Sequence, residues 1–497
     1  MTSLVSNNVP NCVDNWVGNL VPNCLNDTQH TAAMTTDKVG TQSITTRGPA
    51  NTGFYIDWGD GSALEWVQHL GTLTNVVTTH TYSTAGTKYQ KWIGDLSQVN
   101  YINIGAQSYI FNAGIEIPKF KSLTILYVQT NAGLYGDIST WSVLTSLQYM
   151  YAYDLPLVTG DLSSWSALTS LIIMYFLRNT GVSCNVSSWS ALTNLTVLHI
   201  YGSTGLTGDV SSWSALTSLT SLICYGCTGL TGDISSWSAL TSLTILNCGN
   251  CTGLTGDISS WSALTSLTTL QCYGCTGLTG NISSWSALTS LTTLHCYDCT
   301  GLTGDVSSWS ALTSLTELRC YGCTGITGNV SSWSALTSLV TLYCYSCTGI
   351  TGDVSSWSAL TSLTNFRCYG CTGITGNVSS WSALTSLVTL YCYSCTGLTL
   401  DIDDWKTLTS ANIHAYSLSS ATYTTAILPP WSNKTLRFDS TGLSTAEVDQ
   451  LILDINTAGG NNVTLNVAGT NEPHTTGGAV DAAITAIVGR GGVVTVN

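Results

Sequence analysis

Sixteen of the nineteen cysteines form eight Cys-x-x-Cys pairs, a spacing that can bind zinc or form disulfides. The pairs recur every 24 residues, from Cys224 and Cys227 to Cys392 and Cys395. Two such pairs could supply the four thiolates of a structural zinc site. A third interpretation is that the cysteines are small buried thiols, which pack in register along a repeated structure.

A row of tyrosines accompanies the cysteines and could bind a ligand. One tyrosine follows the first cysteine position of each repeat, and Gly249 interrupts the row. The row consists of Tyr201, Tyr225, Tyr273, Tyr297, Tyr321, Tyr345, Tyr369 and Tyr393. Tyrosine offers a flat apolar ring and a polar hydroxyl, which suit sugar rings or a protein partner. Stacking between neighbouring strands would also explain the row, and both interpretations stay open.

Two further columns vary between repeats that are otherwise nearly identical. The main column lies directly before the first cysteine position and reads His199, Ile223, Asn247, Gln271, His295, Arg319, Tyr343, Arg367 and Tyr391. The second column lies two residues earlier and includes Glu317 and Asn365. We take His295, Arg319, Tyr343, Arg367 and Tyr391 as candidate ligand-binding residues, together with the tyrosine row. Neutral drift at tolerant surface positions is the alternative.

A row of Asp and Asn residues runs from Asp137 to Asp401, and the two types alternate from Asn281 onward. The alternation would relieve repulsion between stacked carboxylates, and calcium binding between neighbours is the alternative. Four members, Asn185, Asn281, Asn329 and Asn377, lie in Asn-x-Ser sequons, which act only in a glycosylating host.

Residues for catalysis do not form a recognisable motif. The seven histidines are scattered, and the glycines belong to repeat turns rather than to a phosphate-binding loop. Paired carboxylates occur only along the repetitive Asp row, whereas glycoside hydrolysis needs an acid and a base in a cleft. The sequence therefore predicts a non-enzymatic protein without a cofactor or a metal site.

A constant 24-residue period defines the elements that must position these side chains. Twelve tryptophans mark it: Trp141, Trp165, Trp189, Trp213, Trp237, Trp261, Trp285, Trp309, Trp333, Trp357, Trp381 and Trp405. A fixed period of this length predicts a solenoid, in which each unit buries its apolar face against its neighbours. The tryptophans are expected to be structural anchors on the return side of each coil.

One full unit reads LTTLHCYDCTGL at Leu291–Leu302, followed by TGDVSSWSALTS. This pattern resembles the leucine-rich repeat over roughly residues 120–410. The resemblance implies a right-handed coil with a parallel β-sheet on its concave face, where the variable columns and the tyrosines would point outward. It also places the first cysteine inward and the second at the position of the ladder Asn, which favours structural thiols. In earlier coils we assign the two positions to Ile200 with Ser203, and to Tyr151 with Asp154.

The segments before and after the repeats form separate regions. FYIDWGDGS at Phe54–Ser62 and THTYSTAGTKY at Thr79–Tyr89 resemble the polycystic-kidney-disease (PKD) type of immunoglobulin-like β-sandwich. We expect an N-terminal arm over 1–45, this module over 46–115, the solenoid of about twelve coils over 116–410, and a small α/β cap over 411–497. A capping box at Ser444-x-x-Glu447 predicts one helix of the cap. A strand at 463–467, a helix at 479–488 and a strand at 492–496 should complete it.

Composition limits the partners and the location. Charged residues make up 8% of the chain and the net charge is −14, which disfavours nucleic-acid binding. No apolar run is long enough for membrane insertion, and the N-terminus has no basic and apolar segments of a secretory signal. These features favour a phage virion component, such as a tail-fibre or decoration protein, that binds a host-surface glycan or protein beside other virion subunits. The alternative is an extracellular bacterial surface adhesin or a filament subunit, and a homo-oligomer is compatible with either.

Overall fold

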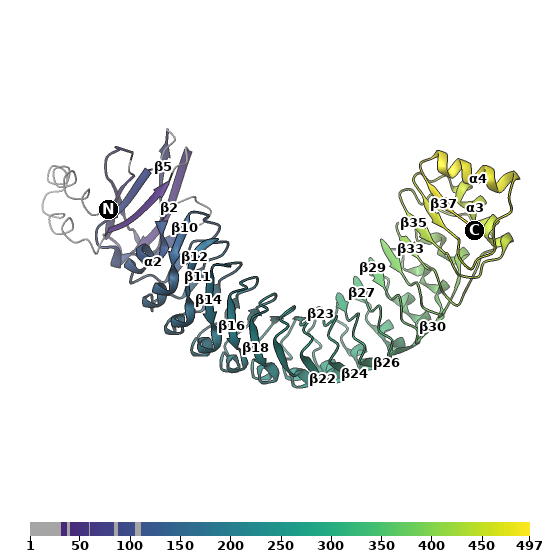
Figure 1. The fold of residues 1–497 in the computed structure, drawn as a ribbon, viewed down its shortest axis with the longest axis horizontal. Coiled ribbons are helices and arrows are strands. Elements are labelled where there is room, and N and C mark those ends of the chain that lie inside the picture. The colour runs from purple at the N-terminus through teal and green to yellow at the C-terminus, as the bar shows by residue number, and fades with distance from the viewer. Residues whose placement is uncertain (1–30, 37–39, 59, 84–87, 105–110) are drawn as a thin grey trace. The chain divides into compact units, whose positions relative to one another are not determined.

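The computed structural model describes residues 31–36, 40–58, 60–83, 88–104 and 111–497. The chain forms two compact units, Met1–Gly232 and Asp233–Asn497. The first unit holds an N-terminal β-module and the first coils, and the second holds the remaining coils and two α-helices (Figure 1). Cys12 and Cys24, the two cysteines that precede the repeats, lie outside the described residues.

The N-terminal module contains a four-stranded antiparallel sheet. Its strands, in spatial order, are β1 (Thr31–Thr36), β6 (Lys88–Ile93), β3 (Gly53–Asp57) and β4 (Glu65–Gln68). A second set pairs β5 (Gly71–Tyr82) and β7 (Tyr101–Asn103) with β2 (Gly40–Gly48), also antiparallel. Strand β1 and part of β2 therefore lie inside the segment 1–45, for which the sequence indicated only an arm. Strand β7 also pairs with the first strand of the coils, β9 (Ile125–Tyr127).

The two motifs that resemble the PKD module lie against each other in this region. The ring of Trp58 stacks on His80 at a centroid distance of 4.8 Å, and the hydroxyl of Tyr82 donates a hydrogen bond to the Trp58 carbonyl. His80 Nε2 lies 2.7 Å from Asp60 Oδ2. Burial raises the pKa of Asp60, but hydrogen bonds from Ser62 and His80 outweigh it and lower this pKa to about 2. The Asp60 carboxylate is therefore used in local packing, because it bonds to Ser62 in its own loop and to His80 of the second motif.

Each coil consists of a three-residue strand, a turn, a second short strand and a 3-10 helix. The three-residue strands pair in parallel and bury their middle residue, as Leu294 and Leu318 do. In the first unit they are β9, β11 (Tyr149–Tyr151), β13 (Ile173–Tyr175), β15 (Val197–His199) and β17 (Ser221–Ile223). In the second unit they are β19 (Ile245–Asn247), β21 (Thr269–Gln271), β23 (Thr293–His295), β25 (Glu317–Arg319), β27 (Thr341–Tyr343), β29 (Asn365–Arg367), β31 (Thr389–Tyr391) and β33 (Asn412–His414).

The second strand of each coil joins another parallel ladder. In the first unit this ladder contains β8 (Phe111–Asn112), β10 (Leu134–Asp137), β12 (Leu157–Asp161), β14 (Val182–Asn185), β16 (Leu206–Asp209) and β18 (Leu230–Asp233), which ends at the unit boundary. In the second unit it contains β20 (Leu254–Asp257), β22 (Leu278–Asn281), β24 (Leu302–Asp305), β26 (Ile326–Asn329), β28 (Ile350–Asp353), β30 (Ile374–Asn377), β32 (Gly397–Asp401) and β34 (Ser420–Thr422).

Short helices form the return side of the coils. In the first unit they are η3 (Leu96–Gln98), α2 (Ala113–Glu116), η4 (Ile117–Lys119), η5 (Ile138–Val143), η6 (Leu162–Ala167), η7 (Val186–Ala191) and η8 (Ser211–Ala215). In the second unit they are η9 (Ile234–Ala239), η10 (Ile258–Ala263), η11 (Ile282–Ala287), η12 (Ser307–Ala311), η13 (Val330–Ala335), η14 (Ser355–Ala359), η15 (Val378–Ala383) and η16 (Ile402–Thr407).

The tryptophans are buried structural anchors, as the sequence predicted. In the second unit, Trp309 stacks on Trp333 with a centroid distance of 6.2 Å and nearly parallel rings. Its Nε1 donates a 3.2 Å hydrogen bond to the Ile282 carbonyl of the preceding coil. Each ring thus fills the core between coils and satisfies a backbone acceptor that would otherwise be buried without a partner.

The Asp and Asn row caps the 3-10 helices. Asp257 Oδ1 accepts a 2.9 Å hydrogen bond from the Ser259 amide, and Asn281 Oδ1 accepts one of 3.0 Å from Ser283. Either side chain provides this acceptor, so capping explains why Asp and Asn exchange along the row. A Cβ at Gly280, whose φ is +127°, would lie 2.3 Å from Asp257 Oδ1. Only glycine therefore fits beside the capping oxygen.

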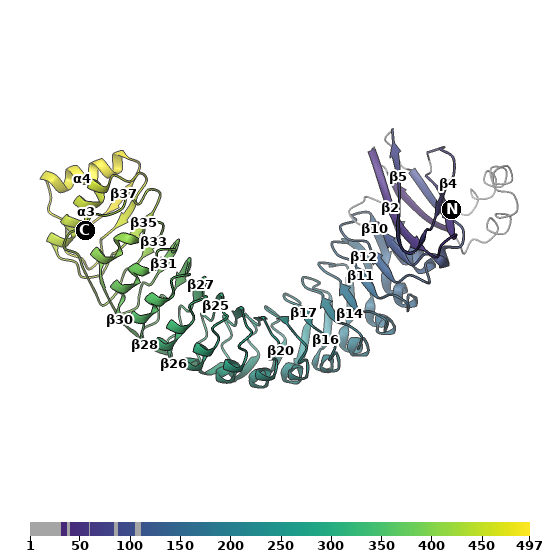
Figure 2. The same ribbon diagram turned by 180° about the vertical axis from the view of Figure 1, so that it is seen from behind.

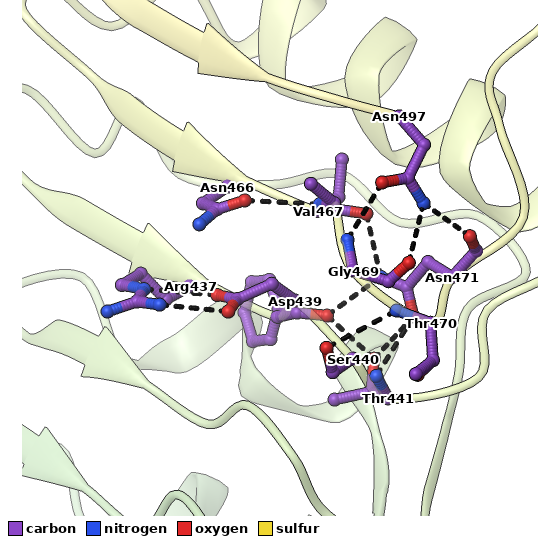
Figure 3. A network of polar contacts seen from close by, with 12 residues as sticks. Arg437, Asp439, Ser440, Thr441, Asn466, Val467, Gly469, Thr470, Asn471 and Asn497 are labelled. Atoms are coloured by element: carbon purple, nitrogen blue, oxygen red, sulfur yellow. Dashed lines mark hydrogen bonds and ion pairs between the residues drawn. The ribbon is translucent and has the colours of Figure 1, made fainter.

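The parallel ladder continues beyond residue 410, where the tryptophan period ends. Strand β33 pairs with β35 (Thr435–Arg437), β35 with β36 (Thr464–Asn466), and β36 with β37 (Val493–Thr495). The spacing between paired positions changes here to 23 and then 29 residues, which hid these coils from a search at 24. Buried Asn471 bridges the last turns, because its amide donates to the Phe438 and Val467 carbonyls (Figure 3).

Two α-helices pack together at the C-terminal end of the second unit (Figure 2). Helix α3 (Thr445–Ala458) begins with the predicted capping box of Ser444 and Glu447, and it buries Val448, Leu451, Ile452 and Ile455. Helix α4 (Gly478–Gly489) and strands β36 and β37 lie within one residue of the sequence expectation at most boundaries. No helix among the described residues has the length and apolarity to cross a bilayer.

Candidate binding face

The outward side chains of the three-residue strands, with the tyrosine row beside them, form a surface that we name the strand face. Burial alternates along strands such as β25, β27 and β29, so their variable positions point away from the core while the central residue is fully buried. Ser221, Asn247 and His295 are the exceptions, because these variable positions are buried as well. All eight tyrosines of the row are half-buried. The structure thus brings the predicted site residues of each unit onto one face, in register from coil to coil.

Beneath the strand face, the cysteines form a ladder of buried free thiols. From Cys275 to Cys395, the second cysteine of each pair donates to the carbonyl of the first cysteine in the preceding coil, as Cys323 does to Cys296 at 2.9 Å. The thiol of Cys323 and burial raise the pKa of Cys296 well above its usual value, so a thiolate is disfavoured. This arrangement agrees with the structural interpretation of the Cys-x-x-Cys pairs.

Earlier coils use other side chains at the same ladder position. Ser203 donates to the Phe176 carbonyl at 3.2 Å, and Asn179 donates to the Ala152 carbonyl at 2.7 Å. The sequence assignment of Tyr151 and Asp154 to the two cysteine positions is wrong by one residue. Ala152 and Leu155 occupy them and are fully buried, whereas Tyr151 and Asp154 lie at the surface side. The tryptophan period would have fixed the register, because Ala152 precedes Trp165 by the same number of residues as Cys224 precedes Trp237.

The tyrosine row is a continuous ring stack in the second unit. Neighbouring rings from Tyr273 to Tyr393 have centroid distances of 4.2–4.7 Å and interplanar angles of 8–13°. In the first unit, Tyr201 stacks on Tyr225 in the same way at 4.6 Å. The faces of the inner rings are therefore covered by other rings, so only ring edges and hydroxyl groups are open to a ligand.

Sequence reasoning missed an additional member of this stack. Tyr416 lies 4.3 Å from Tyr393, with rings inclined by 5°. It follows Tyr393 by 23 residues instead of 24, and it has no cysteine before it. A search that allowed one deletion per coil would have found it.

The main variable column forms a second stack beside the row. The Arg319 guanidinium lies 5.0 Å from the Tyr343 ring centre, and Arg367 lies between Tyr343 and Tyr391 at 4.8 and 5.1 Å. His414, which sequence reasoning also missed, stacks on Tyr391 at 4.0 Å. Cation–π contacts and ring stacking thus hold these long side chains in place at half-buried positions.

The other end of the column is held by hydrogen bonds. The Asn247 amide donates to Gln271 at 2.6 Å, and Gln271 Nε2 lies 3.1 Å from His295 Nδ1. His295 is 8% exposed and its Nε2 lies 3.1 Å from Glu317 Oε1. Of the five predicted column residues, His295 is therefore the least accessible to a partner.

Burial shifts the pKa values of two tyrosines and one histidine on the strand face. Burial lowers the pKa of His414 to about 4, and the positive charge of Arg437 acts in the same direction. Burial and neighbouring phenols raise the pKa of Tyr321 and Tyr369. Tyr321 and Tyr369 therefore keep their protons at neutral pH, and His414 is neutral.

Hollows elsewhere are small. One, of about 340 Å³, lies between Thr425–Leu428 and the Asp454 side of helix α3, and another, of about 350 Å³, is lined by Thr130, Asp154 and Arg178 in the first unit. Neither is lined by a histidine or a cysteine. Across the described ranges, no three His, Cys, Asp or Glu side chains converge as a metal site would require.

The sequence matches no known protein-family model and no curated protein. Solved structures are similar in fold. The functional domain of InlJ from Listeria monocytogenes, which includes a cysteine ladder, has a TM-score of 0.55 at 20% identity over 76% of each chain. The leucine-rich-repeat ectodomain of the Arabidopsis thaliana receptor kinase GASSHO1/SCHENGEN3, in complex with CASPARIAN STRIP INTEGRITY FACTOR 2, has a TM-score of 0.53 at 19% identity, over 72% of this chain and 45% of that one.

A third similar structure is the Arabidopsis receptor kinase HAESA in complex with the peptide hormone IDA and the co-receptor SERK1. Its TM-score is 0.53 at 16% identity, over 76% of this chain and 71% of that one. Identities at this level establish similarity of fold. Together with the parallel strand ladders and the repeated LxxLxC units, they show that the chain has the leucine-rich-repeat solenoid fold.

Proposed function

We propose that this is a non-enzymatic recognition protein that binds a partner through the strand face of the second unit. The observation that carries the proposal is the stack of Arg319, Tyr343, Arg367 and Tyr391 in the main variable column. These side chains differ from coil to coil, whereas the core residues beneath them are nearly constant. The fold does not require different side chains in this column, whereas specific recognition of a partner requires a surface that differs from coil to coil.

The residue types suit a protein interface. Tyrosine and arginine are enriched at the energetic centres of interfaces, because they combine a large contact area with polar tips. Stacking and cation–π contacts restrict the side chains before binding, so less conformational entropy is lost on association. The tyrosine row adds a line of hydroxyl donors along the same edge.

A protein partner fits the geometry better than a glycan. A sugar that packs on tyrosine needs an open ring face, and the inner rings of the row have neighbours on both faces. HAESA, which has a similar fold, is in complex with a peptide hormone. A glycan that binds through ring edges and hydroxyl groups is the second outcome of the test below.

The location of the protein is the second part of the proposal. We place the protein on an extracellular surface, with a phage virion component as the first proposal and a bacterial surface adhesin as the second. Many copies on one particle would convert weak contacts into strong attachment. A filament subunit is the remaining alternative, for which electron microscopy of the purified protein should show regular polymers.

The test compares two double variants of the full chain. Tyr343→Ser with Tyr391→Ser removes the rings of the variable column, and Ser284→Ala with Ser308→Ala changes the return side of the same unit. Binding to a panel of bacterial and animal cells, a surface-protein array and a glycan array is measured, with circular dichroism as the control for folding. We expect about tenfold weaker binding for the tyrosine variant only. Equal binding by both variants would contradict the proposal.

A further inference from the structure

The arginines of the coils differ in whether a carboxylate neutralises them. Arg178 lies 2.6 Å from Asp154, and Arg319 lies 2.5 Å from Glu317. Arg437 forms two hydrogen bonds to Asp439, as Figure 3 shows. Arg367 is different, because in the described part of the chain no ion pair joins it to a carboxylate. The Nε atoms of Arg319 and Arg367 both lack a hydrogen-bond acceptor.

A near-duplication within the chain explains the difference. Residues 319–349 recur without change at 367–397, so the coil that follows Arg319 is the same as the coil that follows Arg367. The preceding column residue is His295 for Arg319 and Tyr343 for Arg367. The second variable column differs, because Glu317 precedes Arg319 whereas Asn365 precedes Arg367. The Asn365 amide bonds to the Thr364 hydroxyl at 3.0 Å and carries no charge. One coil thus contains its own counter-ion, and the other leaves the same site uncompensated.

The Arg367 side chain is held in a position to receive an anion. Tyr343 and Tyr391 lie on either side of its guanidinium, at 4.8 and 5.1 Å. Its Nε is buried and has no acceptor, while the residue as a whole is half-buried. A planar guanidinium fixed between two rings offers its N–H groups in the geometry that a carboxylate accepts in pairs.

We propose that Arg367 binds the carboxylate of an acidic side chain on the protein partner. This inference rests on the proposed function and specifies the chemistry of its partner. A protein carboxylate is favoured over an acidic polysaccharide, because the flanking phenols Tyr343 and Tyr391 are themselves covered on the faces that contact Arg367 and leave no platform for a sugar. In the ion pair of Arg319, Glu317 supplies the carboxylate that we expect the partner to supply to Arg367.

The experiment exchanges the residues that distinguish the two coils. Asn365→Glu should give Arg367 an internal counter-ion, and Glu317→Asn should free Arg319. Both changes place a residue that the chain already accommodates at the equivalent position, so folding should be preserved. Asn377→Asp is the matched control, because it adds the same charge on the return row, where Asp is also native.

Binding of fluorescein-labelled hexaglutamate, hexaglutamine and polygalacturonate is measured by anisotropy at about 0.15 M salt, where long-range repulsion from the net charge of −14 is screened and a close ion pair is screened less. Hexaglutamate should bind the wild-type chain, about tenfold more weakly after Asn365→Glu, and more tightly after Glu317→Asn. Asn377→Asp should match the wild type. The inference would be overturned if hexaglutamate did not bind, or if its affinity were unchanged by both Asn365→Glu and Glu317→Asn. It would also be overturned if polygalacturonate bound more tightly than hexaglutamate and its binding depended on Arg367.

The two experiments distinguish a failure of this inference from a failure of the proposed function. If cell or protein binding responds to the Tyr343 and Tyr391 variant while hexaglutamate does not respond to the exchanges, the strand face recognises its partner without this carboxylate contact. If neither responds, the strand face is not the binding surface.

Discussion

At the residue scale, small polar side chains fix the path of the backbone at each coil. Asp305 Oδ1 accepts a 2.8 Å hydrogen bond from the Ser307 amide. The cysteine thiols perform an equivalent task on the strand side, where each satisfies a buried carbonyl of the preceding coil. The cysteine-containing coils of the second unit repeat these local bonds from coil to coil, which explains why their core sequence is so uniform.

Capping by Asp305 can be tested by two substitutions. Asp305→Ala should lower the free energy of unfolding by about 1 kcal/mol, because the Ser307 amide loses its acceptor. Asp305→Asn should change it little at neutral pH, since Asn supplies the same oxygen. Urea unfolding monitored by circular dichroism measures both. Equal losses in the two variants would contradict a capping role.

The same pair predicts a dependence on pH. Hydrogen bonds from Ser307 lower the pKa of Asp305 in the folded state. The stabilisation is therefore complete above the unfolded-state pKa of about 3.9, and it is lost as the pH falls through the lower folded-state value. The wild type should lose stability relative to Asp305→Asn in this acidic range, and the difference between them should be constant from pH 5 to pH 7.

Sequence patterns predicted the roles of most single residues of the coils, but not their pairing. The Cys-x-x-Cys spacing and the period together favoured structural thiols, and the structure agrees. The tyrosine row left stacking and binding open, because a pattern of residue types contains no ring orientation. Whether an arginine of the variable column has a counter-ion depends on the residue two positions earlier, which is Glu317 before Arg319 and Asn365 before Arg367. The sequence pattern identified both columns but did not predict which of their side chains form an ion pair.

At the element scale, the tryptophans hold one coil to the next. Trp309 contributes a buried ring between two others and a hydrogen bond to the Ile282 carbonyl. Trp309→Leu should cost about 3 kcal/mol, because it leaves a cavity and an unmet acceptor. Thermal unfolding measures the loss, and hydrogen exchange should show faster opening of η11 and η12 than of distant coils. Uniform destabilisation of all coils would contradict the local role.

Elements with their own sequence marker were predictable, and elements defined by contact were not. Helix α3 was recognisable from Ser444, Glu447 and its apolar stripe. The strands β33 and β35 lie where the spacing of the repeat changes, so they were not recognised as coils. Strands β1 and β2 were missed because their sequence is polar, and pairing with β6, β5 and β7 defines them.

At the scale of the whole molecule, repeated coils separate stability from recognition. Each coil contacts its neighbours through the same ladders, so total stability should be close to a sum over coils and interfaces. The strand face, by contrast, differs between coils. Removal of one coil should therefore have a similar effect on folding wherever it is made, but an effect on binding that depends on which coil is removed.

Two deletions of 24 residues test the central claim most directly. Deletion of 269–292 removes Tyr273 of the tyrosine row but no member of the variable-column stack from Arg319 to Tyr391. Deletion of 341–364 removes Tyr343 from that stack and leaves the repeat in register. Melting temperature and binding to the same cell and protein panel are measured for both. We predict similar melting temperatures, with binding retained by the first deletion and weakened at least tenfold by the second. Equal binding by the two deletions, or no binding by the wild type, would contradict recognition through the strand face.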